Sequence, residues 1–286
     1  MKTAPQQSKA NTRVLSLNLR QRTLALILLS ISLLVAMVLS GSFIGTDKLG
    51  IDFDQKNQSP SLSHLFGTDW LGRDMLARVL KGLTLSLAVG VIAAFISTLI
   101  ALVLSLLATV NKVMDHVVSW LIDLFLSVPH LVTLVLISFV VGGGFKGVVI
   151  GLSLTHWPSL ARLLRAELLQ IRNMEYVEVS RRLGKSRMWI ARRHFMPHLI
   201  PQLIVGFTLL FPHAILHEAA VTFLGFGLSP EQPAIGIILS ESMQYLSTGM
   251  WWLAFFPGLS LLLMVGIFDL LGHQVRKLMD PFHAMK

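Results

Sequence analysis

Two histidines stand four residues apart in a largely apolar stretch, at a spacing that suits a metal ion. They are His213 and His217 in the segment Pro212-His-Ala-Ile-Leu-His-Glu218. In a helix, side chains at positions i and i+4 lie on one face, so both imidazoles can approach one cation. The spacing therefore predicts a transient metal contact at His213 and His217.

Other ionisable side chains also stand in apolar segments, where each is costly to place in hydrocarbon and normally faces the interior of a helix bundle. They are Asp123, His130, His156, Glu218 and Asp269. A lone histidine there is usually a hydrogen-bonded packing residue, but His156 and the pair make three, so metal contact and packing both stay open. We group His156 and Glu218 with the pair as candidate contacts. Asp123 and Asp269 are expected to be structural, through pairing or capping.

The residue order argues against catalysis by this chain. An intramembrane zinc protease of the HExxH type needs a glutamate directly after its first histidine, as general base. Ala214 occupies that place, and Glu218 follows the second histidine instead. The sequence also has no GxxxxGK[ST] phosphate-binding loop, so it cannot hydrolyse nucleotide itself. We assign no catalytic residue.

The composition places these side chains in a membrane protein. Of the 286 residues, 53% are hydrophobic and only 14% are charged, against about 25% charged in a soluble domain. The absence of cysteine excludes a disulfide framework and any cysteine-based metal or nucleophile site. Lys and Arg exceed Asp and Glu by nine, which suits either nucleic acid or positively charged cytoplasmic loops.

Six stretches approach the roughly 20 apolar residues that a helix needs to cross the hydrocarbon core. They cover about 23–43, 82–109, 117–141, 147 onward, 199–224 and 251–271. The fourth soon meets Arg162 and Arg165, whose long stems can reach the interface. The sequence thus predicts an all-α polytopic membrane protein with six transmembrane helices.

The positions of the cations orient these helices. Of the 24 Lys and Arg, 18 fall in the N-terminal arm, the loop near Lys112, the segment 162–193 and the tail. By the positive-inside rule both termini are cytoplasmic, and no nucleic-acid partner is needed to explain the charge. The resulting division is an arm 1–22, a first span 23–44, an extracytoplasmic loop 45–81, a core 82–272 with a cytoplasmic loop 166–197, and a tail 273–286.

The loop 166–197 is longer than two neighbouring helices need for their connection. Its sequence predicts two short helices joined at Gly184, where glycine supplies a left-handed turn. Ser186 is a plausible N-cap of the second helix, and Pro197 is expected to limit it. A cationic hairpin with exposed hydrophobic side chains fits a docking site for a cytosolic partner. It equally fits an amphipathic loop on anionic lipid.

The same loop resembles the "EAA" loop of ATP-binding-cassette (ABC) importer permeases, through the spacing from Glu178 to Gly184 and on to His194-Phe-Met-Pro197. Val179 and Ser180 replace the two alanines that name the motif, a mild departure. In that family the loop couples to the ATPase. The resemblance implies this role for Glu175, Glu178, Arg182, Gly184, Trp189, His194 and Pro197.

Further motifs resemble those of the "C" subunits in the peptide/nickel branch of these permeases. They are His64-Leu-Phe-Gly-Thr-Asp-Trp-Leu-Gly-Arg-Asp74, Phe223-Leu-Gly-Phe-Gly-Leu228, Phe256-Pro-Gly-Leu259 and the ending Leu270 to Pro281. Together they span about residues 60–282 in the family's order. The chain is thus identified as a member of this branch.

The resemblance implies a type I importer permease with the MetI-like fold, in the bacterial cytoplasmic (inner) membrane. It implies a heterodimer with a paralogous permease, two cytosolic ABC ATPases and an extracytoplasmic substrate-binding protein, besides contact with membrane lipid. No cofactor belongs to the chain itself, because the ATPases would bind ATP and Mg²⁺. The segments 45–81 and 228–250 are expected at the outer face, with a short helix within 233–246 that meets the binding protein or only seals the membrane edge.

The cargo is predicted from the histidines. His213 to His217 resembles the HxxLH stretch of nickel-type permeases, and Thr155-His156-Trp157 resembles their SHW. This implies a translocation path along His156, His213, His217 and Glu218. The expected cargo is nickel or another transition metal, either as the ion or as a metallophore chelate. A di- or oligopeptide stays the alternative, because selectivity lies largely in the binding protein. A secondary transporter is disfavoured, since the two halves show no internal repeat.

Overall fold

The computed structural model describes residues 18–45 and 49–279. The first 17 residues of the predicted arm and the tail from residue 280 lie outside the described residues. The described residues are mainly helical, and the one β-type contact among them is an isolated bridge from Thr68 to Asp74. The predicted all-α class is confirmed.

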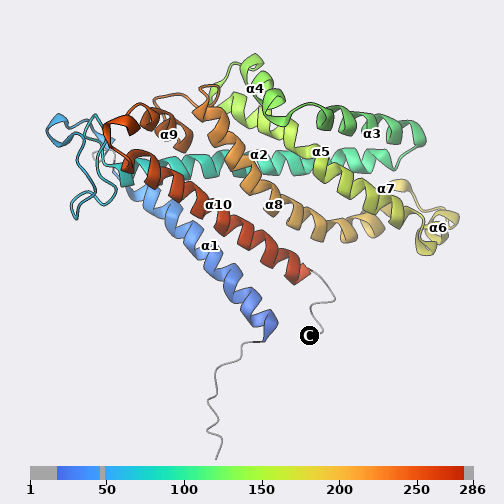
Figure 1. The fold of residues 1–286 in the computed structure, drawn as a ribbon. Helices are drawn as coiled ribbons and strands as arrows, with labels where there is room; N and C mark the ends of the chain where they lie inside the picture. Colours follow the sequence, from blue (N-terminus) through green and yellow to red (C-terminus); the bar gives the residue numbers. More distant parts are fainter. Residues whose placement is uncertain (1–17, 46–48, 280–286) are drawn as a thin grey trace, which may run out of the picture.

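The long helices pack beside one another in a bundle (Figure 1). The α-helices are α1 (Leu19–Phe43), α2 (Met75–Ala108), α3 (Lys112–Ser127), α4 (His130–Val140), α5 (Gly144–Arg172), α6 (Glu175–Arg182), α7 (Arg187–Ile190), α8 (Met196–Phe223), α9 (Ile235–Met243) and α10 (Trp252–Met279). Two short 3-10 turns, η2 (Phe53–Gln55) and η4 (Leu246–Thr248), lie in loops, and the π-helical turn η3 (Ala191–Phe195) joins α7 to α8. The predicted short helix within 233–246 is α9.

Among the described residues, four helical stretches are long and apolar enough to cross a membrane: α1, α2, Arg187–Phe223 and α10. A fifth exists if α3 and α4 count as one bent span. The helix α5 is 29 residues long but carries several charges, including Lys146, Arg162 and Arg165. Six spans and cytoplasmic termini therefore stay predictions.

The stretch 117–141, predicted as one span, is not one continuous helix. The chain forms α3 and α4, which meet at an angle of 99°. Pro129 lacks an N–H and disfavours a helical conformation in the residue before it. Val128 accordingly adopts an extended backbone, with φ −93° and ψ 140°. The break places His130 in the first turn of α4, close to α5.

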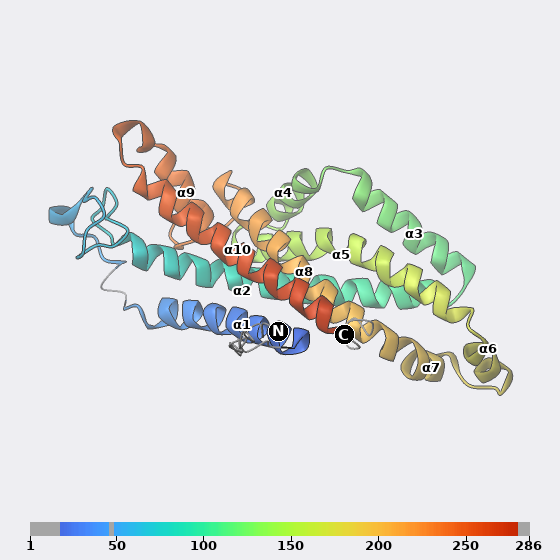
Figure 2. The ribbon, with the colours of Figure 1, turned by 60° about the horizontal axis from the view of Figure 1, so that its bottom comes forward.

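A seam of small residues lets α2 lie along α5 (Figures 1 and 2). The buried positions on α2 recur every three or four residues, and those that pack with residues of α5 include Ala93, Ser97, Ala101, Ser105 and Ala108. Small side chains allow two helix backbones to approach closely, and hydroxyls can bridge them. The Ser97 hydroxyl donates to the Ser153 carbonyl at 3.0 Å, and the Ser105 hydroxyl donates to the Ala161 carbonyl at 3.1 Å. The seam fixes α5 along its length.

The helix α4 also packs closely on α5, for a similar reason. A Cβ added to Gly147 would lie 2.7 Å from the Ser138 carbonyl oxygen, and one added to Gly151 would lie 2.7 Å from the side chain of Leu134. Neither glycine has room for a side chain, so the sequence of α5 determines how near α4 comes. His130 and His156 are brought together by this contact.

The helices run between two ends of the bundle, seen in both ribbon views. The segment 49–74 and α9 lie at one end, here called the loop end. The start of α1 and the end of α10 lie toward the opposite side, and α6 and α7 form the far tip of that side, here called the hairpin end.

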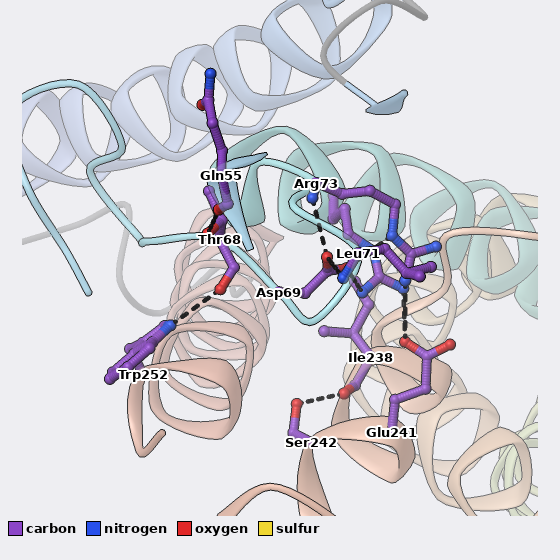
Figure 3. A network of polar contacts seen from close by, with 10 residues as sticks. Gln55, Thr68, Asp69, Leu71, Arg73, Ile238, Glu241, Ser242 and Trp252 are labelled. Atoms are coloured by element: carbon purple, nitrogen blue, oxygen red, sulfur yellow. Dashed lines mark hydrogen bonds and ion pairs between the residues drawn. The ribbon is translucent and has the colours of Figure 1, made fainter. Parts of the chain in front are cut away.

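One buried carboxylate organises the loop end (Figure 3). Asp69 is fully buried and accepts hydrogen bonds at 2.9 Å from the backbone N–H groups of Leu71 and Arg73. It also accepts from Arg73 Nε at 2.7 Å and from Arg78 Nη1 at 2.8 Å. The carboxylate thus joins the loop to the first turn of α2.

The same network reaches two more helices. Arg78 Nη2 donates to Glu241 Oε2 on α9 at 2.7 Å, and the Trp252 indole on α10 donates to the Thr68 carbonyl at 3.3 Å. Removing one partner of a buried ion pair leaves the other charge without compensation in a low-dielectric site. The stretch His64–Asp74 is therefore a structural clamp between α2, α9 and α10.

Replacing Asp69 by Asn should destabilise the protein by about 3 kcal/mol, because Arg78 would lose its fully buried counter-charge and keep only the partly exposed Glu241. The midpoint of thermal unfolding of the detergent-purified protein, followed by circular dichroism, measures this. Asp54→Asn is the matched control, since Asp54 is an exposed carboxylate of the same loop. Equal midpoints for both variants would contradict the clamp.

Candidate functional site

The predicted turn at Gly184 is present, and hydrogen bonds explain it. The N–H of Gly184 donates to the Arg181 carbonyl at 3.0 Å, and the N–H of Lys185 donates to the Ser180 carbonyl at 3.1 Å. These two bonds form a Schellman motif, which requires a left-handed residue after the helix. Gly184 has φ 75°, as predicted. The Ser186 hydroxyl accepts from the N–H of Trp189 at 3.2 Å, so the predicted N-cap of α7 is confirmed.

The hairpin formed by α6 and α7 is anchored from inside. Val177, Ile190 and Phe195 are buried in one apolar cluster with residues of α2, α3 and α5. Across the hairpin, Ser180 Oγ and His194 Nε2 lie 2.9 Å apart. These contacts hold α6 and the start of α8 in one unit.

The outer surface of the hairpin is both cationic and hydrophobic. Leu183 is 72% exposed and Met188 is 77% exposed, although large apolar side chains normally avoid water. Glu178 forms ion pairs with Arg181 at 3.0 Å and with Arg182 at 3.1 Å on the same helix. Of the other predicted coupling residues, Glu175, Trp189 and Pro197 are exposed. The predicted residues therefore lie together, on the hairpin and on the π-helical turn and first residues of α8 that follow it.

Pro197 does not end the second helix, contrary to the sequence-based expectation. The segment from Arg187 to Phe223 is one 37-residue helix through α7, the π-helical turn and α8. Pro197 is the second residue after the π-helical turn η3, where the regular i to i−4 hydrogen-bond pattern is already interrupted. On the other side, α5 runs to Arg172, only two residues before α6 begins. The hairpin is thus nearly continuous with two long helices.

A cavity of about 800 Å³ lies between the hairpin and the end of α2. Its walls are mainly apolar and include Leu106, Leu107, Ile190 and Phe195. Four cations also line it, Arg172, Arg181, Lys185 and Arg187. This cluster of positive charge attracts acidic groups to the hairpin end.

Three histidines from three helices meet in the middle of the fold. His130 begins α4, His156 lies within α5, and His217 lies within α8. The ring centroids of His130 and His156 are 4.4 Å apart, those of His130 and His217 are 4.5 Å apart, and those of His156 and His217 are 5.3 Å apart. His156 is buried, and the other two rings are half-buried.

The structure pairs His217 with other helices rather than with His213. His213 lies one turn earlier on α8, is exposed and stands outside the cluster. His130 was among the ionisable residues noted in the sequence, but its distance along the chain from His156 and His217 does not indicate that the three side chains meet. Only the break at Pro129 and the close packing of α4 on α5 bring it near them.

The remaining ionisable candidates have structural contacts. Glu218 is fully buried and accepts from the Thr222 hydroxyl at 2.9 Å, and the N–H of Leu228 donates to that hydroxyl at 3.2 Å. Asp123 pairs with Arg162 at 2.7 Å, with both side chains exposed. Asp269 lies 3.4 Å from His273 in the next turn. Pairing was the role predicted for both aspartates.

Comparison with known proteins identifies the class of the chain. Residues 101–281 match the family described as binding-protein-dependent transport system inner membrane component. A putative peptide transport system permease protein of Brucella suis is 34% identical over 224 residues, which cover 78% of this chain and 75% of that protein. The dipeptide transport system permease protein DppC of Bacillus subtilis is 33% identical over 228 residues, 79% of this chain and 71% of that protein.

A third relative and two solved structures are also transporter components. The glutathione transport system permease protein GsiD of Escherichia coli is 33% identical over 231 residues, 80% of this chain and 76% of that protein. An inward-facing structure of the MetNI methionine ABC transporter superposes with a TM-score of 0.59 at 23% identity, covering 72% of this chain and 98% of that chain. An amino acid ABC transporter crystallised with histidines gives a TM-score of 0.54 at 20% identity, covering 74% and 95%.

These structures share the MetI-type importer fold, and the sequence relatives are permease subunits, which leave ATP hydrolysis to partner ATPases. The resemblance seen in the sequence motifs is confirmed. The chain belongs to the family of inner-membrane components of binding-protein-dependent transport systems, and it is a non-catalytic, integral membrane permease subunit of an ABC importer.

Proposed function

We propose that this permease serves a peptide importer. The observation that carries the proposal is the set of relatives at 33–34% identity, whose names give peptide, dipeptide and glutathione transport. They support the peptide alternative better than the predicted nickel or metallophore cargo, for which they give no support. The histidine spacing indicates a metal contact and does not by itself identify what the importer carries.

In this proposal the chain pairs with a second, different permease to form the path, in the bacterial inner membrane. Two cytosolic ABC ATPases supply the energy, and an extracytoplasmic binding protein delivers the peptide to the loop end. The loop end suits such a partner because its clamp holds α2, α9 and α10 in a fixed relation. The predicted path residues His156, His213, His217 and Glu218 stay part of the proposal.

The hairpin α6–α7 would be the lever on which the ATPase acts. Its exposed Leu183 and Met188 provide an apolar contact, and its cations provide attraction for acidic groups. Because α5 and Arg187–Phe223 lead directly out of the hairpin, a displacement at its tip passes to both long helices. The importer would alternate between inward-open and outward-open states by this movement.

Deleting the gene for this chain should reduce uptake of labelled di- and oligopeptides by at least about tenfold, because the path lacks one wall without it. Uptake is measured in whole cells, and a plasmid copy of the gene should restore it. Nickel uptake in the same strains serves as the comparison. Unchanged peptide uptake together with lost nickel uptake would contradict the peptide assignment and restore the metal cargo.

Replacing Gly184 by Val should uncouple transport from ATP hydrolysis. No atom lies within 4 Å of an added Cβ, so the cost is the left-handed backbone alone, about 1–2 kcal/mol for a residue with a side chain. The hairpin would relax to another turn. We expect peptide uptake by the reconstituted importer to fall at least about fivefold while basal ATPase activity persists.

Two controls sharpen this test. Gly184→Asn should stay coupled, because asparagine tolerates the left-handed conformation. Gly249→Val places the same strain at φ 86°, also with no atom within 4 Å, but at the loop end. If Gly184→Val and Gly249→Val transport equally well, the hairpin is not the lever.

A further inference from the structure

The histidine cluster has the donor atoms of a metal site. Each of His130, His156 and His217 offers one ring nitrogen, and these three atoms all lie within 4.8 Å of one another. Nitrogen ligands at about 2.1 Å from a metal ion stand about 3.4 Å apart in tetrahedral geometry. Small rotations of half-buried rings would therefore suffice to bring the three nitrogens onto one ion.

The hydrogen bond of His156 determines which of its nitrogens is free. Its Nδ1 lies 3.0 Å from the Leu152 carbonyl oxygen, which can only accept. Nδ1 must therefore carry the proton, so Nε2 holds a lone pair. A backbone carbonyl bound to the far nitrogen is also how metal-ligating histidines are usually oriented.

That lone pair has no partner within the described part of the chain. His156 is 7% exposed, and its Nε2 is buried without a hydrogen bond. No hydrogen bond found for the described residues uses a ring nitrogen of His217 either. Buried polar atoms are nearly always paired, and an unpaired one costs about 1–3 kcal/mol. A packing role alone for His156 would leave this cost without compensation.

We propose that His130, His156 and His217 bind a divalent transition metal ion of the class that favours imidazole, such as Zn²⁺, Co²⁺ or Ni²⁺. Three neutral nitrogen donors leave one position of a tetrahedral ion open to water or another ligand. His156 closes the site from inside, and the half-buried rings of His130 and His217 leave it reachable from the surface. The site does not depend on what the importer carries.

This site differs from the pair expected from the sequence. Its ligands come from α4, α5 and α8, so it forms only in the folded protein, whereas His213 and His217 would bind within one helix. The two possibilities make opposite predictions for His213, which stands outside the cluster.

Cobalt binding tests the site directly. The importer complex containing the full chain is purified in detergent, stripped with a chelator and titrated with Co²⁺, whose visible absorption reports tetrahedral nitrogen ligation. We expect one ion that His130→Gln, His156→Gln or His217→Gln each weakens at least about tenfold. His116→Gln is the matched control, because His116 is an exposed histidine on α3.

The His213→Ala variant decides between the two sites. If His213→Ala still binds Co²⁺ and His130→Gln does not, the result supports the three-helix site. If His213→Ala loses Co²⁺ binding and His130→Gln retains it, the three-helix site is overturned. Equal Co²⁺ binding by all variants also overturns it. If His156→Gln fails to fold, the half-buried His130 and His217 still decide the outcome. Peptide uptake is measured separately, so failure of the metal site leaves the proposed function standing.

Discussion

The close contact between α2 and α5 is the constraint on which the rest of this permease depends. Small residues on α2 and hydrogen bonds donated by the hydroxyls of Ser97 and Ser105 fix α5 along its length. In an apolar environment such contacts replace the hydrophobic effect as the force between helices. Since α5 carries His156 and leads into α6, the seam positions both the histidine cluster and the hairpin.

The hairpin and the histidines are consequently parts of one mechanical unit. The hairpin joins the end of α5 to the start of the long helix that carries His217. A force on the hairpin that changes the angle between these helices would also change the separation of His156 and His217.

Local signals in the sequence predicted local structure well. The turn at Gly184, the cap at Ser186 and the short helix α9 each follow from a few neighbouring residues. The family resemblance rested on motifs spread along the chain and was confirmed. The clamp around Asp69 and the recruitment of His130 depend on residues from distant segments, so spacing alone could not predict them. Pro197 misled because the π-helical turn that precedes it and continues the helix could not be predicted from the local sequence.

Docking of the hairpin on the ATPase can be tested by site-specific cross-linking. The chain has no cysteine, so a single cysteine at Met188, which is 77% exposed on the hairpin, can carry a photoreactive label in native membranes. We expect this label to cross-link to the ATPase. The same label on Leu62→Cys should give no such cross-link, because Leu62, which is 99% exposed, lies at the loop end. A label at residue 188 that cross-links only to lipid would contradict docking on the ATPase.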